Sequence, residues 1–159
     1  MSIEMQLRAM PESEIREDWN WLEQFMGEAG DFDRFQAERR AGIAEAVEYH
    51  FQALHEVYRA AYSPQGPYDW ELPVLGGRPV YHAAYSQTPF LILDPTKVRG
   101  AADFLTAASF ETLWVAAKSK PAFNWAEDKD SFLAHHADLR AFYSRVAPTG
   151  QAVVKAFWY

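Results

Sequence analysis

The closing stretch of the chain, residues 131–159, constrains the fold most, because a helical pattern is followed there by an apolar strand. Apolar and aromatic side chains recur at intervals of three and four residues, which is one face of an α-helix. They are Phe132, His136, Leu139, Tyr143 and Val146, widened by Leu133 and Phe142. We expect Ser131 to cap this helix, and Pro148 with Gly150 to end it, since proline cannot continue a helix and glycine tolerates the left-handed turn.

The strand that follows, residues 152–159, is β-branched and aromatic and carries one charge, Lys155. Both of its faces are nearly apolar. A strand that buries both faces is typical of the interior of a sheet rather than its edge.

Three elements are expected before it in the first half of the chain. Residues 3–9 alternate apolar and polar side chains, which predicts a strand with one buried and one solvated face. A short amphipathic helix follows, with the stripe Ile15, Trp19, Leu22 and Met26. Residues 33–62 are predicted to be helical, as one long helix or two joined near Gly42, with the stripe Ile43, Val47, His50, Phe51, Leu54, Tyr58 and Ala61.

The middle of the chain is expected to hold a loop, short strands and further helices. Residues 63–67 contain two prolines and a glycine, which indicates a loop. Residues 72–75, 78–84 and 88–93 are predicted as short strands. Asp94 and Pro95 are typical of a helix start, and Ser109 starts a second helix. The sequence therefore predicts one compact α+β domain over residues 1–159, with a mixed, mostly antiparallel sheet packed against several amphipathic helices and the C-terminal strand in its interior.

Five segments together resemble a known family. They are PFLILDPTKV (89–98), AADFL (101–105), SFETL (109–113), HADLRAFY (136–143) and QAVVKAF (151–157). They resemble the YfbM-like family of small bacterial proteins, a domain of unknown function. The resemblance covers roughly the second half of the chain and implies a compact α+β fold without established catalytic residues. One departure is the run Asp18-Trp-Asn-Trp-Leu, which lacks the histidine that many members carry on the first helix.

Composition restricts the function classes. The chain has 159 residues with a formal net charge of −7, which disfavours a nucleic-acid phosphate backbone as partner. It has no cysteine, so thiolate catalysis, disulfides and iron–sulfur clusters are excluded. No apolar run approaches the roughly 20 residues that span a bilayer, and no signal peptide is evident. We expect a cytoplasmic protein that does not bind membranes, as a monomer or a small homo-oligomer.

A polar and aromatic group between Tyr68 and Tyr85 is the candidate ligand site. Its members are Asp69, Trp70, Glu71, Arg78, Tyr81 and His82. Aromatic walls with a few convergent polar groups are typical of a small-molecule pocket. The alternative for the same residues is a solvated loop followed by an edge hairpin.

Other chemistry has little support in the sequence. His50 and His136 lie on apolar stripes, where a hydrogen-bonded core histidine is the first interpretation and a two-helix metal site with a carboxylate is the alternative. We assign no catalytic residue, metal or cofactor. Of two functions, we favour a non-enzymatic binding or protein-interaction module that presents acidic surface and the aromatic residues Trp70 and Trp125. The alternative is a small-molecule-binding domain or hydrolase-like enzyme that uses the segment from Tyr68 to Tyr85.

Overall fold

A five-stranded antiparallel sheet forms the centre of the described structure, a computed structural model that describes residues 3–64 and 69–159. The strand order is β2-β1-β5-β4-β3. The strands are β1 (Glu4–Met10), β2 (Ala44–Glu48), β3 (Arg78–Val80), β4 (Phe90–Leu93) and β5 (Ala152–Trp158). Because β5 pairs with β1 on one side and β4 on the other, the predicted interior position of the last strand is confirmed. The predicted α+β class is confirmed as well.

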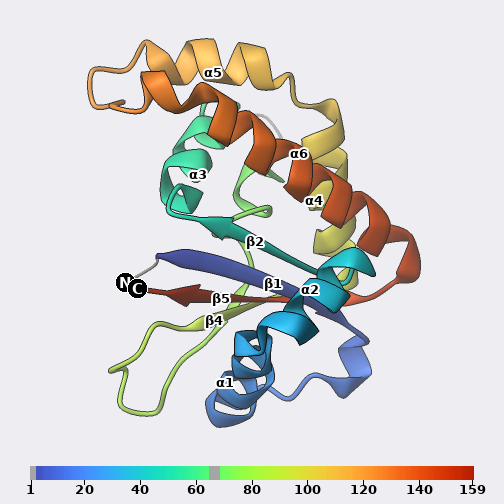
Figure 1. Cartoon of the computed structure of the whole chain (residues 1–159). Helices are drawn as coiled ribbons and strands as arrows, with labels where there is room; N and C mark the ends of the chain where they lie inside the picture. Colours follow the sequence, from blue (N-terminus) through green and yellow to red (C-terminus); the bar gives the residue numbers. More distant parts are fainter. Residues whose placement is uncertain (1–2, 65–68) are drawn as a thin grey trace.

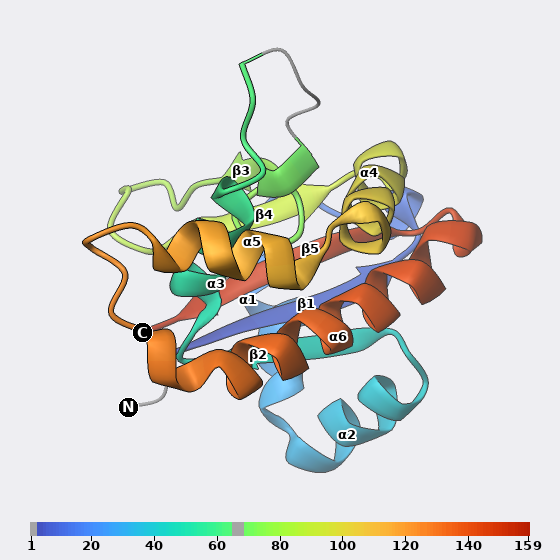
Figure 2. The ribbon, with the colours of Figure 1, turned by 90° about the horizontal axis from the view of Figure 1, so that it is seen from above.

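Helices cover both faces of this sheet (Figures 1 and 2). One face carries α3 (Phe51–Arg59), α4 (Pro95–Ala107), α5 (Phe110–Lys118) and α6 (Lys129–Val146). The opposite face carries α1 (Trp19–Gly27) and α2 (Phe32–Arg40). The larger apolar core lies under α3 to α6, and two smaller clusters lie under α1 and α2. Within the described ranges, no helix combines the length and the apolar character that a membrane crossing requires.

Both faces of β1 are buried, so the predicted solvated face is wrong. Met5 and Leu7 point into the larger core, while Gln6 and Arg8 on the other face are only 8% and 6% exposed. The cause is the second helical layer, which covers this face. Buried polar groups need partners, and Arg8 finds one in Glu38, whose two carboxylate oxygens lie 2.6 and 3.0 Å from the guanidinium nitrogens.

The predicted face of α6 is confirmed with one exception. Phe132, Leu139 and Tyr143 are fully buried, whereas Leu133 is 45% exposed and lies outside the buried stripe. The helix begins at Lys129, two residues before the expected cap Ser131, because a short 3₁₀ turn at Ala126–Asp128 leads directly into it. It ends as expected, with Gly150 in the left-handed conformation at φ +70°.

Helix starts depend on capping side chains. Asp94 accepts a hydrogen bond from the Lys97 backbone N–H at 2.9 Å, which confirms the predicted start of α4. Asp18 likewise accepts a hydrogen bond from the Trp21 backbone N–H at 2.8 Å. Helix α1 therefore begins at Trp19, and Ile15 precedes it rather than belonging to its stripe.

The prediction that residues 33–62 are helical, as one long helix or two joined near Gly42, is wrong for residues 44–48, which form β2 between two helices. Helix α2 ends at Arg40, Gly42 turns the chain with φ +78°, and residues from Ala44 to Glu48 pair with β1. Alanine and glutamate favour helix. Pairing with β1 and burial of Ala44 and Ala46 against α2 outweigh that preference.

The predicted strand at residues 72–75 is instead a turn wrapped around Lys155. The Lys155 ammonium is fully buried in the middle of β5 and donates hydrogen bonds to the backbone carbonyls of Leu72, Val74 (2.9 Å) and Gly76 (2.7 Å). The turn is so tight that a Cβ on Gly76 would lie 2.6 Å from the Leu72 Cα. These three carbonyls therefore accept hydrogen bonds from the ammonium instead of from a neighbouring strand.

Candidate functional site

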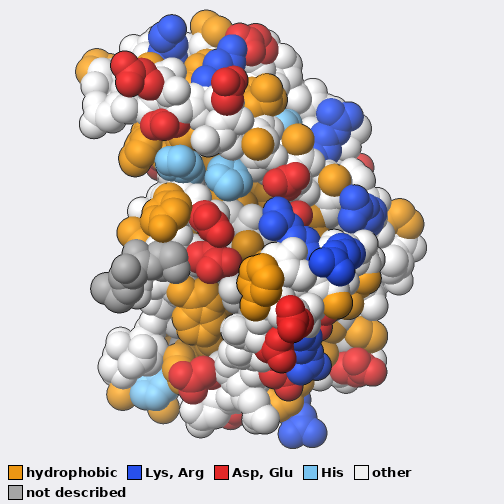
Figure 3. Space-filling view, viewed as in Figure 1, with side chains coloured by type: hydrophobic (Ala, Val, Ile, Leu, Met, Phe, Trp, Pro, Cys, Tyr) orange, Lys and Arg blue, Asp and Glu red, His pale blue; other side chains and the backbone are white. Residues whose placement is uncertain are grey.

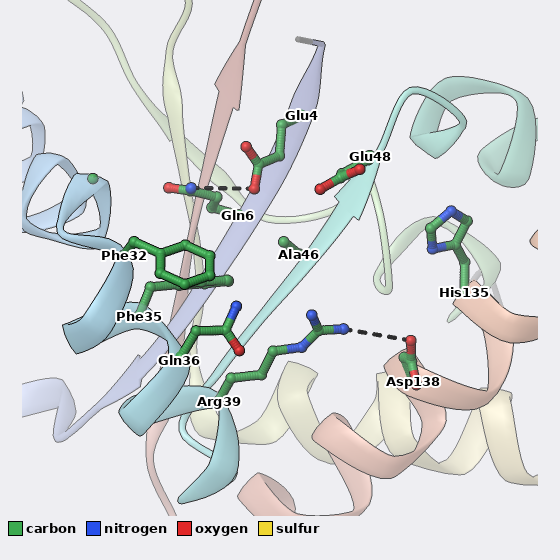
Figure 4. A pocket seen from close by; sticks show the side chains of 11 residues that line it. Glu4, Gln6, Phe32, Phe35, Gln36, Arg39, Ala46, Glu48, His135 and Asp138 are labelled. Atoms are coloured by element: carbon green, nitrogen blue, oxygen red, sulfur yellow. Dashed lines mark hydrogen bonds and ion pairs between the residues drawn. The ribbon is translucent and has the colours of Figure 1, made fainter.

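A cleft of about 490 Å³ opens at the free edge of the sheet, between α2, β2 and α6. Its floor is formed by Glu4 and Gln6 of β1 with Ala46 and Glu48 of β2. One wall is α2, which contributes Phe32, Phe35, Gln36 and Arg39, and the other is α6, which contributes His135 and Asp138 (Figure 4). Figure 3 shows acidic, basic and histidine side chains gathered over the middle of this face.

Two carboxylates lie side by side on the floor of the cleft. Glu4 and Glu48 are directly opposite each other in the pairing of β1 with β2. Like charges at opposite positions of a sheet repel each other. Glu4 accepts a hydrogen bond from the Gln6 side-chain amide at 3.2 Å, while Glu48 is exposed. The pair leaves negative charge facing the cleft.

Arg39 crosses from α2 past the sheet edge toward α6 (Figure 4). Its Nη2 atom lies 2.7 Å from Glu45 Oε1 and 3.6 Å from Asp138 Oδ2. Glu45 also accepts the backbone N–H of Ala46 at 3.0 Å, on the free edge of β2. Burial raises the pKa of Glu45, and this hydrogen bond and Arg39 oppose that rise. The charge of Arg39 is thus already shared between two carboxylates.

The cleft and its immediate surroundings are therefore anionic. The carboxylates of Glu4, Glu48 and Asp138 line the cleft together with one guanidinium, that of Arg39, which is also ion-paired to Glu45 beside the cleft. His135 adds no balancing charge at neutral pH, because burial and the nearby His50 lower its pKa. The negative charge of the cleft favours a cationic group over an anionic one.

An exposed aromatic ring borders this charge. Phe32, the first residue of α2, is 72% exposed, whereas Phe35 one turn later packs on Ala44 and Ala46. Exposed aromatic side chains beside a polar cleft are typical contacts of protein interfaces.

The sequence-predicted ligand residues lie elsewhere, in two groups. Asp69, Trp70 and Glu71 form a 3₁₀ turn in which Trp70 is 7% exposed, so its expected exposure is wrong; it packs against His55 with ring centroids 5.0 Å apart. Trp125, the other aromatic expected at the surface, is 39% exposed. Tyr68 and residues 65–67 of the predicted loop lie outside the described residues.

The second group lies in and directly after β3, on the side of α1. Arg78 forms an ion pair with Glu17, Tyr81 packs on Tyr85 and His82 contacts Trp19 edge to face at 4.8 Å. None of the six predicted residues lines the cleft at β2. Arg78, Tyr81 and His82 thus each contact a different partner, while Trp70 lies in the core under α3.

The two histidines of the alternative metal site do not meet. His50 lies beside His135, with ring centroids 6.0 Å apart, while His136 is hydrogen-bonded through Nδ1 to the Tyr58 hydroxyl at 2.9 Å. Within residues 3–64 and 69–159, no three His, Asp or Glu side chains are grouped so as to hold a metal ion.

Comparison with known proteins adds a family but no activity. Residues 1–155 match the family described as a domain of unknown function, DUF1877. The chain belongs to this family. Its structure is similar to the crystal structure of YfbM, a protein of unknown function from Escherichia coli, with a TM-score of 0.60, 10% identity, and coverage of 98% of this chain and 99% of that one. No curated protein matches the sequence.

These comparisons confirm the YfbM-like resemblance, and at 10% identity the structural likeness shows the fold alone. For this DUF1877 chain, the cleft residues were missed because residues 33–62 were predicted as helix. A signal for the end of helix α2 before β2 was Gly42, two positions after the pair Arg39-Arg40, a combination typical of a helix C-terminus.

Proposed function

We propose that this DUF1877 protein is a binding module whose cleft at the β2 edge receives a basic side chain of a partner protein. The single observation that carries the proposal is the charge of the cleft, which is lined by three carboxylates and by one guanidinium that is already ion-paired to Glu45 and Asp138. A lysine or arginine placed between Glu4 and Glu48 would relieve their repulsion.

The aromatic wall supports a protein partner over a free cation. Phe32 offers an exposed ring at the mouth of the cleft, where it can cover the aliphatic stem of an arginine or stack on its guanidinium. Large rings beside a buried charge are common in the central contacts of protein interfaces.

The test measures binding of a hexa-arginine peptide by calorimetry at about 0.15 M salt, where distant surface charges are screened. A Glu4→Gln, Glu48→Gln variant should bind about tenfold more weakly, the change that 1.4 kcal/mol produces. The matched control is Glu23→Gln, Glu127→Gln, which removes the same charge from exposed positions outside the cleft and should change affinity less than about twofold.

Two outcomes would count against the proposal. Equal weakening by both double variants would mean that the peptide responds to overall charge alone. Absence of binding to the unmodified protein would mean that the cleft does not hold arginine. A hexa-glutamate peptide, which the cleft should repel, checks the sign of the interaction.

A further inference from the structure

A second hollow, separate from the β2 cleft, lies over helix α3 and has a volume of about 460 Å³. Pockets of about 300–1,000 Å³ are the usual size for small-molecule ligands. Three parts of the chain meet there: the turn after β2 with helix α3, the turn around Lys155, and the loop before α6. They contribute Tyr49, Gln52, His55, Glu56, Leu75 and Trp125.

His55 gives this hollow an unused hydrogen-bonding group. Its side chain is 9% exposed, and its Nδ1 atom is enclosed without a hydrogen-bond partner among the described residues. Burial lowers its pKa to about 4, so the ring is neutral at pH 7. An enclosed N–H without an acceptor is rarer in proteins than an unpaired acceptor. We therefore assign the proton to Nε2, which makes His55 a candidate donor among the residues that line the hollow.

Two aromatic rings form the walls. Trp125 is 39% exposed and Tyr49 is 59% exposed. Tyr49 has φ +56°, a backbone conformation that costs a non-glycine residue free energy. Its backbone N–H donates to the Ile3 carbonyl at 2.7 Å, which holds the turn in place. The turn thus keeps a strained tyrosine whose ring is mostly in solvent.

The described residues at the rim of the hollow supply hydrogen-bond acceptors. The Gln52 amide nitrogen donates to the Tyr159 hydroxyl at 3.2 Å, which leaves its Oε1 atom as an acceptor beside the Glu56 carboxylate. No lysine or arginine is among the described residues that line the hollow. Arg59, whose Nη1 atom lies 3.8 Å from Glu56 Oε2, does not line the hollow, so a phosphate or carboxylate placed there would meet the Glu56 carboxylate first.

We propose that this hollow binds the uncharged base of a nucleoside, stacked against Trp125 and Tyr49. A ring nitrogen or carbonyl of the base accepts the hydrogen bond from His55, and an exocyclic amine or ring N–H donates to Gln52 or Glu56. Every base has a flat face for stacking and both donors and acceptors on its edge. This site is independent of the cleft that receives a basic side chain.

The experiment titrates adenosine, guanosine, cytidine and uridine, and the matching 5′-monophosphates, into the full chain by calorimetry. At least one nucleoside should bind saturably, and more tightly than its monophosphate. Trp125→Ala should weaken binding about 5- to 150-fold, the range expected for loss of one stacked ring. Tyr49→Ala should weaken it as well, and Trp125→Phe should retain part of the affinity.

Tyr85→Ala is the matched control, because Tyr85 is also an exposed tyrosine with positive φ, at +51°, and lies outside the hollow. Its affinity should equal that of the unmodified protein. Unchanged near-ultraviolet circular dichroism shows that each variant is folded. Failure of all four nucleosides to bind, tighter binding of the monophosphates, or undiminished binding by Trp125→Ala would each overturn the proposal.

Discussion

Replacing Lys155 with methionine tests whether the buried ammonium holds the turn at residues 72–76 in place. Methionine has a similar unbranched length, so the change removes the charge with little change in volume. It leaves the carbonyl oxygens of Val74 and Gly76 in a dry interior without their donor. The Leu72 carbonyl keeps only a weak contact with the Tyr143 hydroxyl at 3.5 Å, because that hydroxyl donates mainly to the Pro73 carbonyl at 2.9 Å.

The expected loss follows from these two carbonyls. An unsatisfied buried acceptor costs about 1–3 kcal/mol, so two cost about 2–6 kcal/mol. Removing a buried charge recovers part of this, because burial disfavours the charged amine and lowers the pKa of Lys155 well below its usual range. We expect a net loss of about 2–4 kcal/mol in the free energy of unfolding, a large share of the roughly 5–15 kcal/mol typical of a domain.

Urea unfolding at pH 7, followed by circular dichroism, measures this loss. Lys118→Met, at an exposed position, is the control and should change the free energy by less than about 0.5 kcal/mol. Faster amide hydrogen exchange at residues 72–76 in the Lys155 variant would place the damage in the turn. A Lys155→Met protein that is as stable as the original would refute the reasoning, since the ammonium would then contribute nothing beyond its burial cost.

Two further predictions concern α6. Phe142→Ala should lower the free energy of unfolding by about 3–5 kcal/mol, the usual cost of a large cavity, because Phe142 is 2% exposed. Leu133→Ala, at a 45% exposed position on the same helix, is the control. It should lower the free energy of unfolding by under about 1 kcal/mol in the same urea titration. His136 should make stability depend on pH. Burial lowers its pKa to about 4 from an ordinary 6.5, so the unfolded chain binds the extra proton first and stability falls as the pH drops from 6.5 to 4. His136→Gln should reduce that slope and leave the part that His55, whose pKa burial also lowers to about 4, contributes; an unchanged slope would exclude His136 as a source.

The elements set by local chemistry could be predicted from the sequence. The stripe of α6 repeats with helical spacing, Asp94 caps α4, and Gly150 closes the chain into β5. Each of these signals depends on residues within a few positions of one another. The interior position of β5 followed from its lack of a polar face.

The elements set by distant partners could not be predicted. Residues from Ala44 to Glu48 form a strand because β1 is beside them, and nothing nearby in the sequence reports that pairing. The alternation in β1 predicts a solvated polar face, because the sequence does not show that α1 and α2 fold back over that face. The cleft and the hollow each combine residues from several elements, so neither has a local signature.

The pairing of β1 with β5 also has a consequence for how the chain folds during synthesis. Met10 pairs with Ala152, and Glu4 pairs with Trp158, so the middle of the sheet joins segments more than a hundred residues apart. Closing the long loop between such segments costs conformational entropy before the contacts form. Contacts at this separation therefore slow the folding of a domain. Until residues 152–158 have left the ribosome, both the core under α6 and the inner edge of β1 stay open. The nascent chain should therefore depend on chaperones until those residues emerge.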